Sequence, residues 1–149
     1  GGNKALVDLA ALKLRAAHGM LVVRAHYFRF ALPAGVLDAD ELRHGLHGGA
    51  LETSMMLHLL PHAVRREALG DFRSLGARMA ADGCLLGPEG EAGFGWMAQD
   101  LHISGATGNA QHASAALGAR LVDHYAARLA QLIDEAHDFD PAPLKPVPR

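Results

Sequence analysis

A histidine and a glutamate lie on either side of a glycine pair in the run His47-Gly48-Gly49-Ala50-Leu51-Glu52. Glycines reach backbone conformations that other residues rarely adopt, and they leave room close to the chain. The apolar residues that follow predict a helix. Glu52 then falls in its first turn, where the helix dipole favours an ionised carboxylate. A charged carboxylate beside a histidine is what a metal-dependent hydrolase needs, one group to hold the ion and one to move protons. On spacing alone, an ordinary first-turn acid after a glycine-rich loop is the simpler interpretation.

The wider segment carries a family resemblance. The run from His47 to Val64, HGGALETSMMLHLLPHAV, resembles the signature of the creatininase (creatinine amidohydrolase) family, in which His-Ala/Gly-Gly-x-x-Glu-Thr-Ser leads into a helix followed by a proline. Gly1-Gly2-Asn3 resembles the end of that family's Gly-His-Gly-Gly-Asn loop, and Gly105-Ala-Thr-Gly-Asn-Ala110 resembles its Gly-x-x-Gly-Asp/Asn-Pro segment. The three matches occur in family order and reach to about Ile133.

The resemblance implies a metal-dependent amidohydrolase that cleaves the C–N bond of a small amide, formamide or cyclic amide, with Zn, Mn or Fe as its divalent ions. It implies that Glu52 is a metal ligand and that His47 is catalytic, moving protons near the scissile bond. Gly48 and Gly49, which leave room beside the chain, are expected to bind substrate. Tyr27, near the end of an expected strand, is a further substrate-binding candidate, with an ordinary core aromatic as the alternative.

Part of the family's metal site has no counterpart in these 149 residues. The family's N-terminal Glu-x-His-Gly-x-His segment, a following aspartate and the histidine before the Gly-Gly-Asn loop are all missing, so we expect the C-terminal part of a longer enzyme. Gly2 stands where creatinine-cleaving relatives carry a glutamate ligand, which favours a formamide or other small amide over creatinine. The alternative function is a non-catalytic, oligomer-forming fragment or subunit of creatininase-like fold.

Three other candidate sites are set aside. His58 and His62 have a spacing that binds metal on a continuous helix, but Pro61 interrupts that helix. His44 is expected on the surface. The turn over residues 105–109 could bind an anion through backbone N–H groups, but it lacks the lysine of a P-loop and is interpreted as a structural turn.

Composition narrows the function classes. Half of the 149 residues are hydrophobic, enough for a core. The net charge of −2 and the pI near 6.6 give no electrostatic footprint for nucleic acid or an anionic membrane. No run approaches the roughly 20 apolar residues of a membrane span. The single cysteine, Cys84, suits a reducing compartment. We therefore expect a cytoplasmic homo-oligomer whose partner is a small-molecule amide.

The pattern of apolar residues predicts helices over residues 3–18, 52–60 and 111–136, the last from apolar residues at every fourth position between Leu117 and Ile133. Met20–Phe30 is predicted to be a strand, and Phe94–Met97 and Leu101–Ile103 are short strand candidates. A surface loop is predicted over residues 84–95, where glycine is frequent.

This order of elements predicts an α/β fold. The family resemblance implies a layered α/β/α arrangement around a central, mainly parallel sheet, incomplete in this chain. Residues 1–140 are interpreted as the C-terminal part of a creatininase-like domain, and residues 141–149 as a proline-rich tail.

Overall fold

The computed structural model describes residues 4–145 as a mixed α/β protein that is mostly helical, with small sheets. The chain divides into two compact units, one made of residues 4–31 with 125–145 and the other of Leu32–His124. The candidate residues around His47 all belong to the second unit, and Tyr27 belongs to the first.

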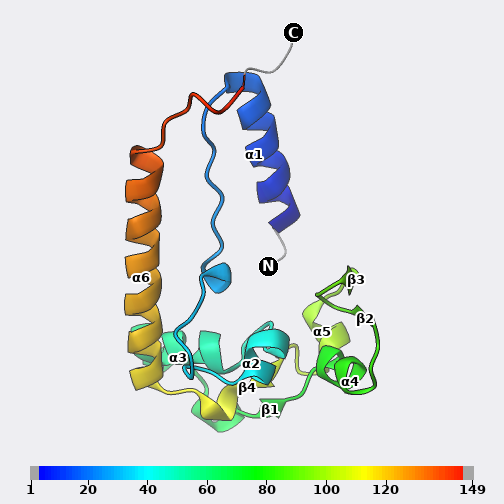
Figure 1. Ribbon diagram of the computed structural model, residues 1–149. Helices are drawn as coiled ribbons and strands as arrows, with labels where there is room; N and C mark the ends of the chain where they lie inside the picture. Colours follow the sequence, from blue (N-terminus) through cyan, green and yellow to red (C-terminus); the bar gives the residue numbers. More distant parts are fainter. Residues whose placement is uncertain (1–3, 146–149) are drawn as a thin grey trace. The chain divides into compact units, whose positions relative to one another are not determined.

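The helices and strands of Figure 1 follow the chain in a simple order. The elements are α1 (Lys4–His18), η1 (Tyr27–Arg29), α2 (Ala39–His44), α3 (Ala50–Leu59), η2 (Pro61–Ala63), η3 (Arg66–Ala68), β1 (Asp71–Phe72), α4 (Leu75–Ala81), β2 (Leu86–Gly87), β3 (Ala92–Gly93), α5 (Ala98–Leu101), β4 (Gly108–Asn109), η4 (Ala110–His112) and α6 (Ala115–His137). The three predicted long helices are confirmed, with ends shifted by a few residues.

In the first unit, the prediction of a strand over Met20–Phe30 is wrong. Met20–Phe30 was expected to form a strand, but residues 20–26 are extended without a ladder partner among the described residues, and Tyr27–Arg29 turn into a 3-10 helix. The chain reverses at Gly19 (φ +66°) and runs back beside α1, where Arg24 pairs with Asp8. β-branched and aromatic residues favour extended backbone, but a strand also needs a neighbour that supplies hydrogen bonds.

The second unit holds two sheets of two strands each. β1 pairs with β4 antiparallel, with Asp71 opposite Asn109, and β2 pairs with β3 in parallel. Neither is the central, mainly parallel sheet that was expected, and residues 4–145 form no larger one. The strand candidates at Phe94–Met97 and Leu101–Ile103 are also wrong. Phe94–Met97 belongs to neither a strand nor a helix, and Leu101 ends the short helix α5 with its side chain fully buried.

The core of the second unit forms where α3 packs against the first turns of α6. Ser54 is fully buried and its hydroxyl accepts a hydrogen bond from the backbone N–H of Ser114 at 3.1 Å. Gly118 of α6 lies so close to α3 that a Cβ there would overlap the carbonyl oxygen of Ser54. Leu57 and Leu121 complete the contact region as buried apolar side chains. The helix behind the His47 loop is therefore held by a contact that only glycine allows.

We expect Gly118→Ala to lower the free energy of unfolding of the full-length protein by about 1–3 kcal/mol, the usual cost of overpacking, despite the better helix propensity of alanine. Gly95→Ala is the matched control, because nothing lies within 4 Å of an added Cβ there. Urea unfolding measures both variants. Equal midpoints would contradict the close packing of α3 on α6.

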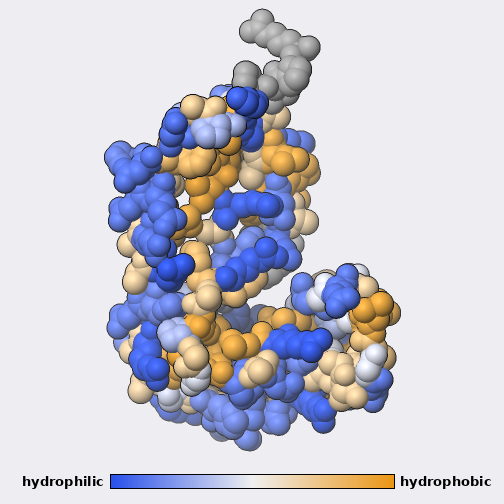
Figure 2. All heavy atoms as spheres, viewed as in Figure 1, coloured by the Kyte–Doolittle hydropathy of each residue, from blue (hydrophilic) through white to orange (hydrophobic). Residues whose placement is uncertain are grey.

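Apolar side chains on α1 and on the later turns of α6 are exposed in the described structure. Leu12 is 71% exposed and Ile133 is 59% exposed, whereas Leu121, on the same periodic face of α6, is buried. Apolar surface is visible over α1 and the extended segment in Figure 2. None of the helices within residues 4–145 has both the length and the hydropathy required to cross a membrane.

Candidate functional site

The loop that carries His47 is fixed by the side chain of Thr107. The Thr107 hydroxyl accepts hydrogen bonds from the backbone N–H groups of Leu46 and His47, each at 3.0 Å. In return, the Thr107 N–H donates to the His47 carbonyl oxygen at 2.6 Å, which makes an isolated antiparallel bridge. Thr107 is fully buried. The predicted turn over residues 105–109 is therefore structural here, because it sets the backbone position of His47.

Glu52 closes the loop from the other side. Gly48 has φ +67°, which a residue with a side chain rarely adopts. Its N–H donates to Oε2 of Glu52 at 2.7 Å, and its carbonyl oxygen accepts from the Thr53 hydroxyl at 3.1 Å. Gly49 is the N-cap of α3, so Glu52 lies in the first turn as predicted. The glycine pair thus makes a sharp turn that directs a carboxylate back onto its own loop.

His47 and Glu52 are brought together by this turn. Nδ1 of His47 lies 3.6 Å from Oε2 of Glu52, and the two side chains are 60% and 37% exposed. The separation is too long for a hydrogen bond but is that of an ion pair when the imidazole is protonated. A solvent-accessible imidazole beside a carboxylate can hold a proton and release it to a bound molecule.

Glu41 is a site residue that sequence reasoning missed. It lies on α2, is 7% exposed, and accepts hydrogen bonds from the N–H groups of Ala50 at 2.6 Å and Asn109 at 2.7 Å. A buried carboxylate is unusual unless it is paired or hydrogen-bonded. Nothing in the spacing of Asp40 and Glu41 distinguishes them from ordinary first-turn acids, and the partners of Glu41 are distant in the sequence.

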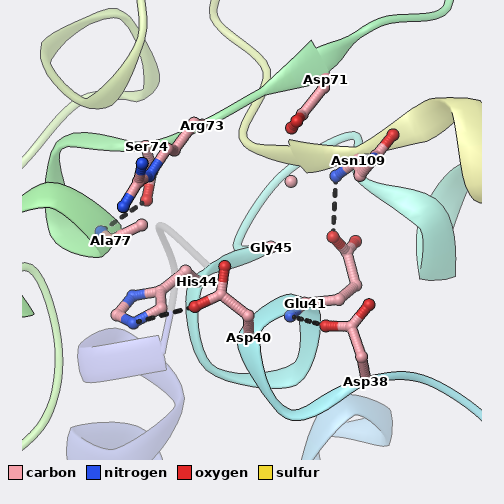
Figure 3. Close-up of a pocket in the computed structure, with 11 residues that line it drawn as sticks. Asp38, Asp40, Glu41, His44, Gly45, Asp71, Arg73, Ser74, Ala77 and Asn109 are labelled. Atoms are coloured by element: carbon pink, nitrogen blue, oxygen red, sulfur yellow. Dashed lines mark hydrogen bonds and ion pairs between the residues drawn. The ribbon is translucent and has the colours of Figure 1, made fainter. Parts of the chain in front are cut away.

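A cavity of about 250 Å³ is lined by Glu41 and other residues of α2 and by residues of β1, α4 and β4 (Figure 3). Its lining includes Asp71 from β1, Arg73 and His44. His44 was expected at the surface, but its side chain is only 14% exposed. Burial lowers the pKa of His44, partly opposed by Asp40, whose Oδ1 lies 3.9 Å from its Nε2. Neither His47 nor Glu52 lines this cavity, so it is separate from the predicted pair.

A family model described as "Creatininase: Creatinine amidohydrolase" matches residues 1–133. The chain belongs to the creatininase family. Its fold is similar to the crystal structure of "Putative creatinine amidohydrolase" from Bacteroides fragilis NCTC 9343, with a TM-score of 0.67, 25% sequence identity and coverage of 94% of this chain. The chain spans about half (51%) of the length of that protein. No curated protein matched the sequence.

Among the residues assigned from the creatininase resemblance, the structure brings His47, Gly48, Gly49 and Glu52 into one loop. The segment Gly1-Gly2-Asn3 lies outside the described residues. Tyr27 belongs to the other unit, where its ring contacts Tyr125 edge-on at 5.3 Å. It is 39% exposed, and burial raises the pKa of Tyr125. The substrate role of Tyr27 stays a prediction.

The metal site expected of a creatininase is not complete within residues 4–145, where no group of three or more His, Cys, Asp or Glu side chains could hold an ion. Structural and catalytic metal sites usually take at least three protein ligands. The donor set at the His47 loop offers one carboxylate and one imidazole. It therefore fits part of a coordination shell, and further ligands would have to come from outside the described residues.

Proposed function

We propose that the full-length protein is a metal-dependent amidohydrolase that cleaves the C–N bond of a small amide, formamide or cyclic amide. The observation that carries the proposal is the His47–Glu52 pair. Its Nδ1–Oε2 distance is 3.6 Å, and it sits on a glycine turn in a chain that belongs to the creatininase family. Both side chains are accessible to a bound molecule while their backbone is fixed by Thr107 and α3.

The proposed reaction adds water to the amide carbonyl carbon and breaks the C–N bond, giving a carboxylic acid and an amine. The leaving nitrogen must take a proton, and we assign its donation to His47, whose accessible imidazole lies beside the Glu52 carboxylate. Gly48 and Gly49 are proposed to bind substrate through their backbone, because a side chain at Gly48 would meet Ala106 and one at Gly49 would meet Glu41. Family membership suggests divalent Zn, Mn or Fe. When bound, such an ion would polarise the carbonyl and lower the pKa of water, with Glu52 as one ligand.

The same proposal extends to the assembly. We place the described residues as half of a layered α/β/α enzyme with a central, mainly parallel sheet, because the similar structure is about twice as long. The exposed apolar side chains of α1 and α6 suit helices that are covered in the complete protein or between copies of it, which supports a homo-oligomer. A cytoplasmic location is proposed on the single cysteine.

The test uses the full-length enzyme, purified with its native metal. Elemental analysis measures bound Zn, Mn and Fe, and chromatography follows hydrolysis of creatinine, 4-nitroformanilide and simple carboxamides. Metal-dependent release of an amine supports the proposal. A metal-free oligomer without turnover on any of these amides would support the alternative, a non-catalytic subunit of creatininase-like fold.

We expect creatinine to be a poorer substrate than 4-nitroformanilide. The reason is Gly2, which stands where creatinine-cleaving relatives carry a glutamate ligand. With Glu52 as the substitute ligand, bound ions would be held differently, and a shift of about 1 Å in a reacting centre can cost roughly 10²-fold in rate. The ratio of kcat/KM for the two substrates measures the preference. Creatinine turnover equal to or above that of the formamide would contradict it.

A further inference from the structure

We propose that Glu41 is a positioning residue for the His47–Glu52 pair, through two hydrogen bonds: one from the backbone N–H of Ala50, between the pair, and one from the backbone N–H of Asn109. The inference rests on the proposed amidohydrolase function for its kinetic consequence, and on the structure alone for the contacts. Glu41 lines the cavity beside α2, which does not include His47 or Glu52, so it acts on the pair through the backbone and not on a substrate beside His47.

The two hydrogen-bond partners of Glu41 lie at the start of α3 and in β4. Ala50, whose N–H donates to Oε1, is the first residue of α3 and lies between His47 and Glu52. The N–H of Asn109 donates to Oε2. Asn109 lies two residues after Thr107, whose hydroxyl accepts from the backbone N–H of His47. One carboxylate thus joins the start of α3 to the strand β4, 9 and 68 residues away from it in the sequence. Figure 3 shows Glu41 reaching from α2 toward Asn109.

Three glycines enclose the Glu41 carboxylate. A Cβ at Gly108 would lie 2.7 Å from both of its oxygens, one at Gly45 would lie 2.5 Å from Oε1, and one at Gly49 would overlap Oε1. Side chains at these positions would displace the carboxylate. The glycines therefore admit it against backbone donors, and Gly49 belongs to the very turn that carries the His47 loop into α3.

The side chain at the N-terminus of α2, Asp38, allows the effect of Glu41 on the His47 loop to be distinguished from an effect on the stability of the helix. Asp38 caps α2 by accepting from the Glu41 N–H at 2.7 Å, so it stabilises the helix without contacting the loop. We expect removal of the Asp38 side chain to weaken α2 while both acceptor oxygens of the Glu41 carboxylate are kept. Replacing Glu41 by glutamine keeps the size of the side chain, but its NH₂ group then faces one of the two backbone N–H donors, which cannot both be satisfied.

The experiment compares Glu41→Gln with Asp38→Ala in the full-length enzyme. Three quantities are measured: amide hydrogen exchange at Ala50 and Asn109, the ring ¹⁵N chemical shifts of His47, and kcat and KM for 4-nitroformanilide. In Glu41→Gln we expect faster exchange at both amides, altered His47 ring shifts and a fall in kcat of about 10–100-fold with KM unchanged, the usual effect of losing a group that orients a catalytic residue. Asp38→Ala should leave the ring shifts and kcat near the wild-type values.

Three results would overturn the proposal: unchanged His47 ring shifts in Glu41→Gln, a kcat equal to wild type, or equal losses in the two variants. If Glu41→Gln does not fold, Glu41→Asp is measured instead, since it keeps the charge but is one methylene shorter and cannot reach both donors. If the wild-type enzyme hydrolyses neither 4-nitroformanilide nor creatinine, the proposed function fails, while hydrogen exchange and the ring shifts still decide whether Glu41 sets the loop.

Discussion

His47→Ala in the full-length enzyme is expected to lower kcat by about 10²–10⁴-fold and to leave the bound metal unchanged. This is the usual loss when a general acid is removed. The backbone of the loop should keep its shape, because Thr107 and Glu52 hold it through backbone N–H groups and not through the imidazole. Steady-state kinetics with 4-nitroformanilide and elemental analysis of the same preparation measure the two effects.

The control for this variant is His62→Ala. His62 is an exposed histidine on η2, a few residues beyond α3, and should tolerate the change without loss of turnover. If His47→Ala also emptied the metal site, the assigned division of roles would be wrong and His47 would be a ligand.

Glu52→Gln is expected to lower the metal affinity of the full-length enzyme by at least about 10²-fold, since even residues that only orient ligands are typically worth about 10–100-fold. The substitution removes the charge that would face an ion. It also replaces the charged acceptor of the Gly48 N–H by a neutral amide, which weakens the hydrogen bond that closes the turn. Metal titration of the apo-enzyme measures the affinity.

Glu67→Gln is the matched control, because Glu67 is an exposed glutamate on η3 and lies outside the loop. Wild-type metal affinity in Glu52→Gln, together with reduced turnover, would reassign Glu52 from metal binding to the support of His47.

Local signals were sufficient for the three helices that were predicted. The 3.6-residue spacing in α1 and α6, the glycine turn before α3 and Pro61 after it are all read within a few residues, and the structure follows them. The strand expected over residues 20–30 is absent because a strand depends on a hydrogen-bonding partner, which can lie anywhere in the sequence. No periodicity within the segment reports whether such a partner is present.

In the candidate site too, contacts between residues close in the sequence were predictable and those between distant residues were not. The contact between His47 and Glu52 follows from a turn of two glycines, so its spacing was visible in the sequence. Thr107 was interpreted only as part of a structural turn, and Glu41 was not assigned any role. Thr107 bonds the loop from 60 residues away, and one of the two bonds of Glu41 joins it to Asn109, 68 residues away. The proximity of His47 and Glu52 was thus predictable from the sequence, whereas the groups that hold them in place were not.

The large sequence separation of these hydrogen-bond partners also determines when the loop can form during translation. Thr107 bonds the backbone of the His47 loop and Asn109 bonds Glu41, and both residues leave the ribosome after His47 and all of α3. Domains generally fold as units from the N-terminus onward, but contacts of large sequence separation must wait for the later partner. A nascent chain that ends before Thr107 therefore carries the histidine and the glutamate without the geometry that relates them. The loop is completed only when the antiparallel bridge between His47 and Thr107 can close.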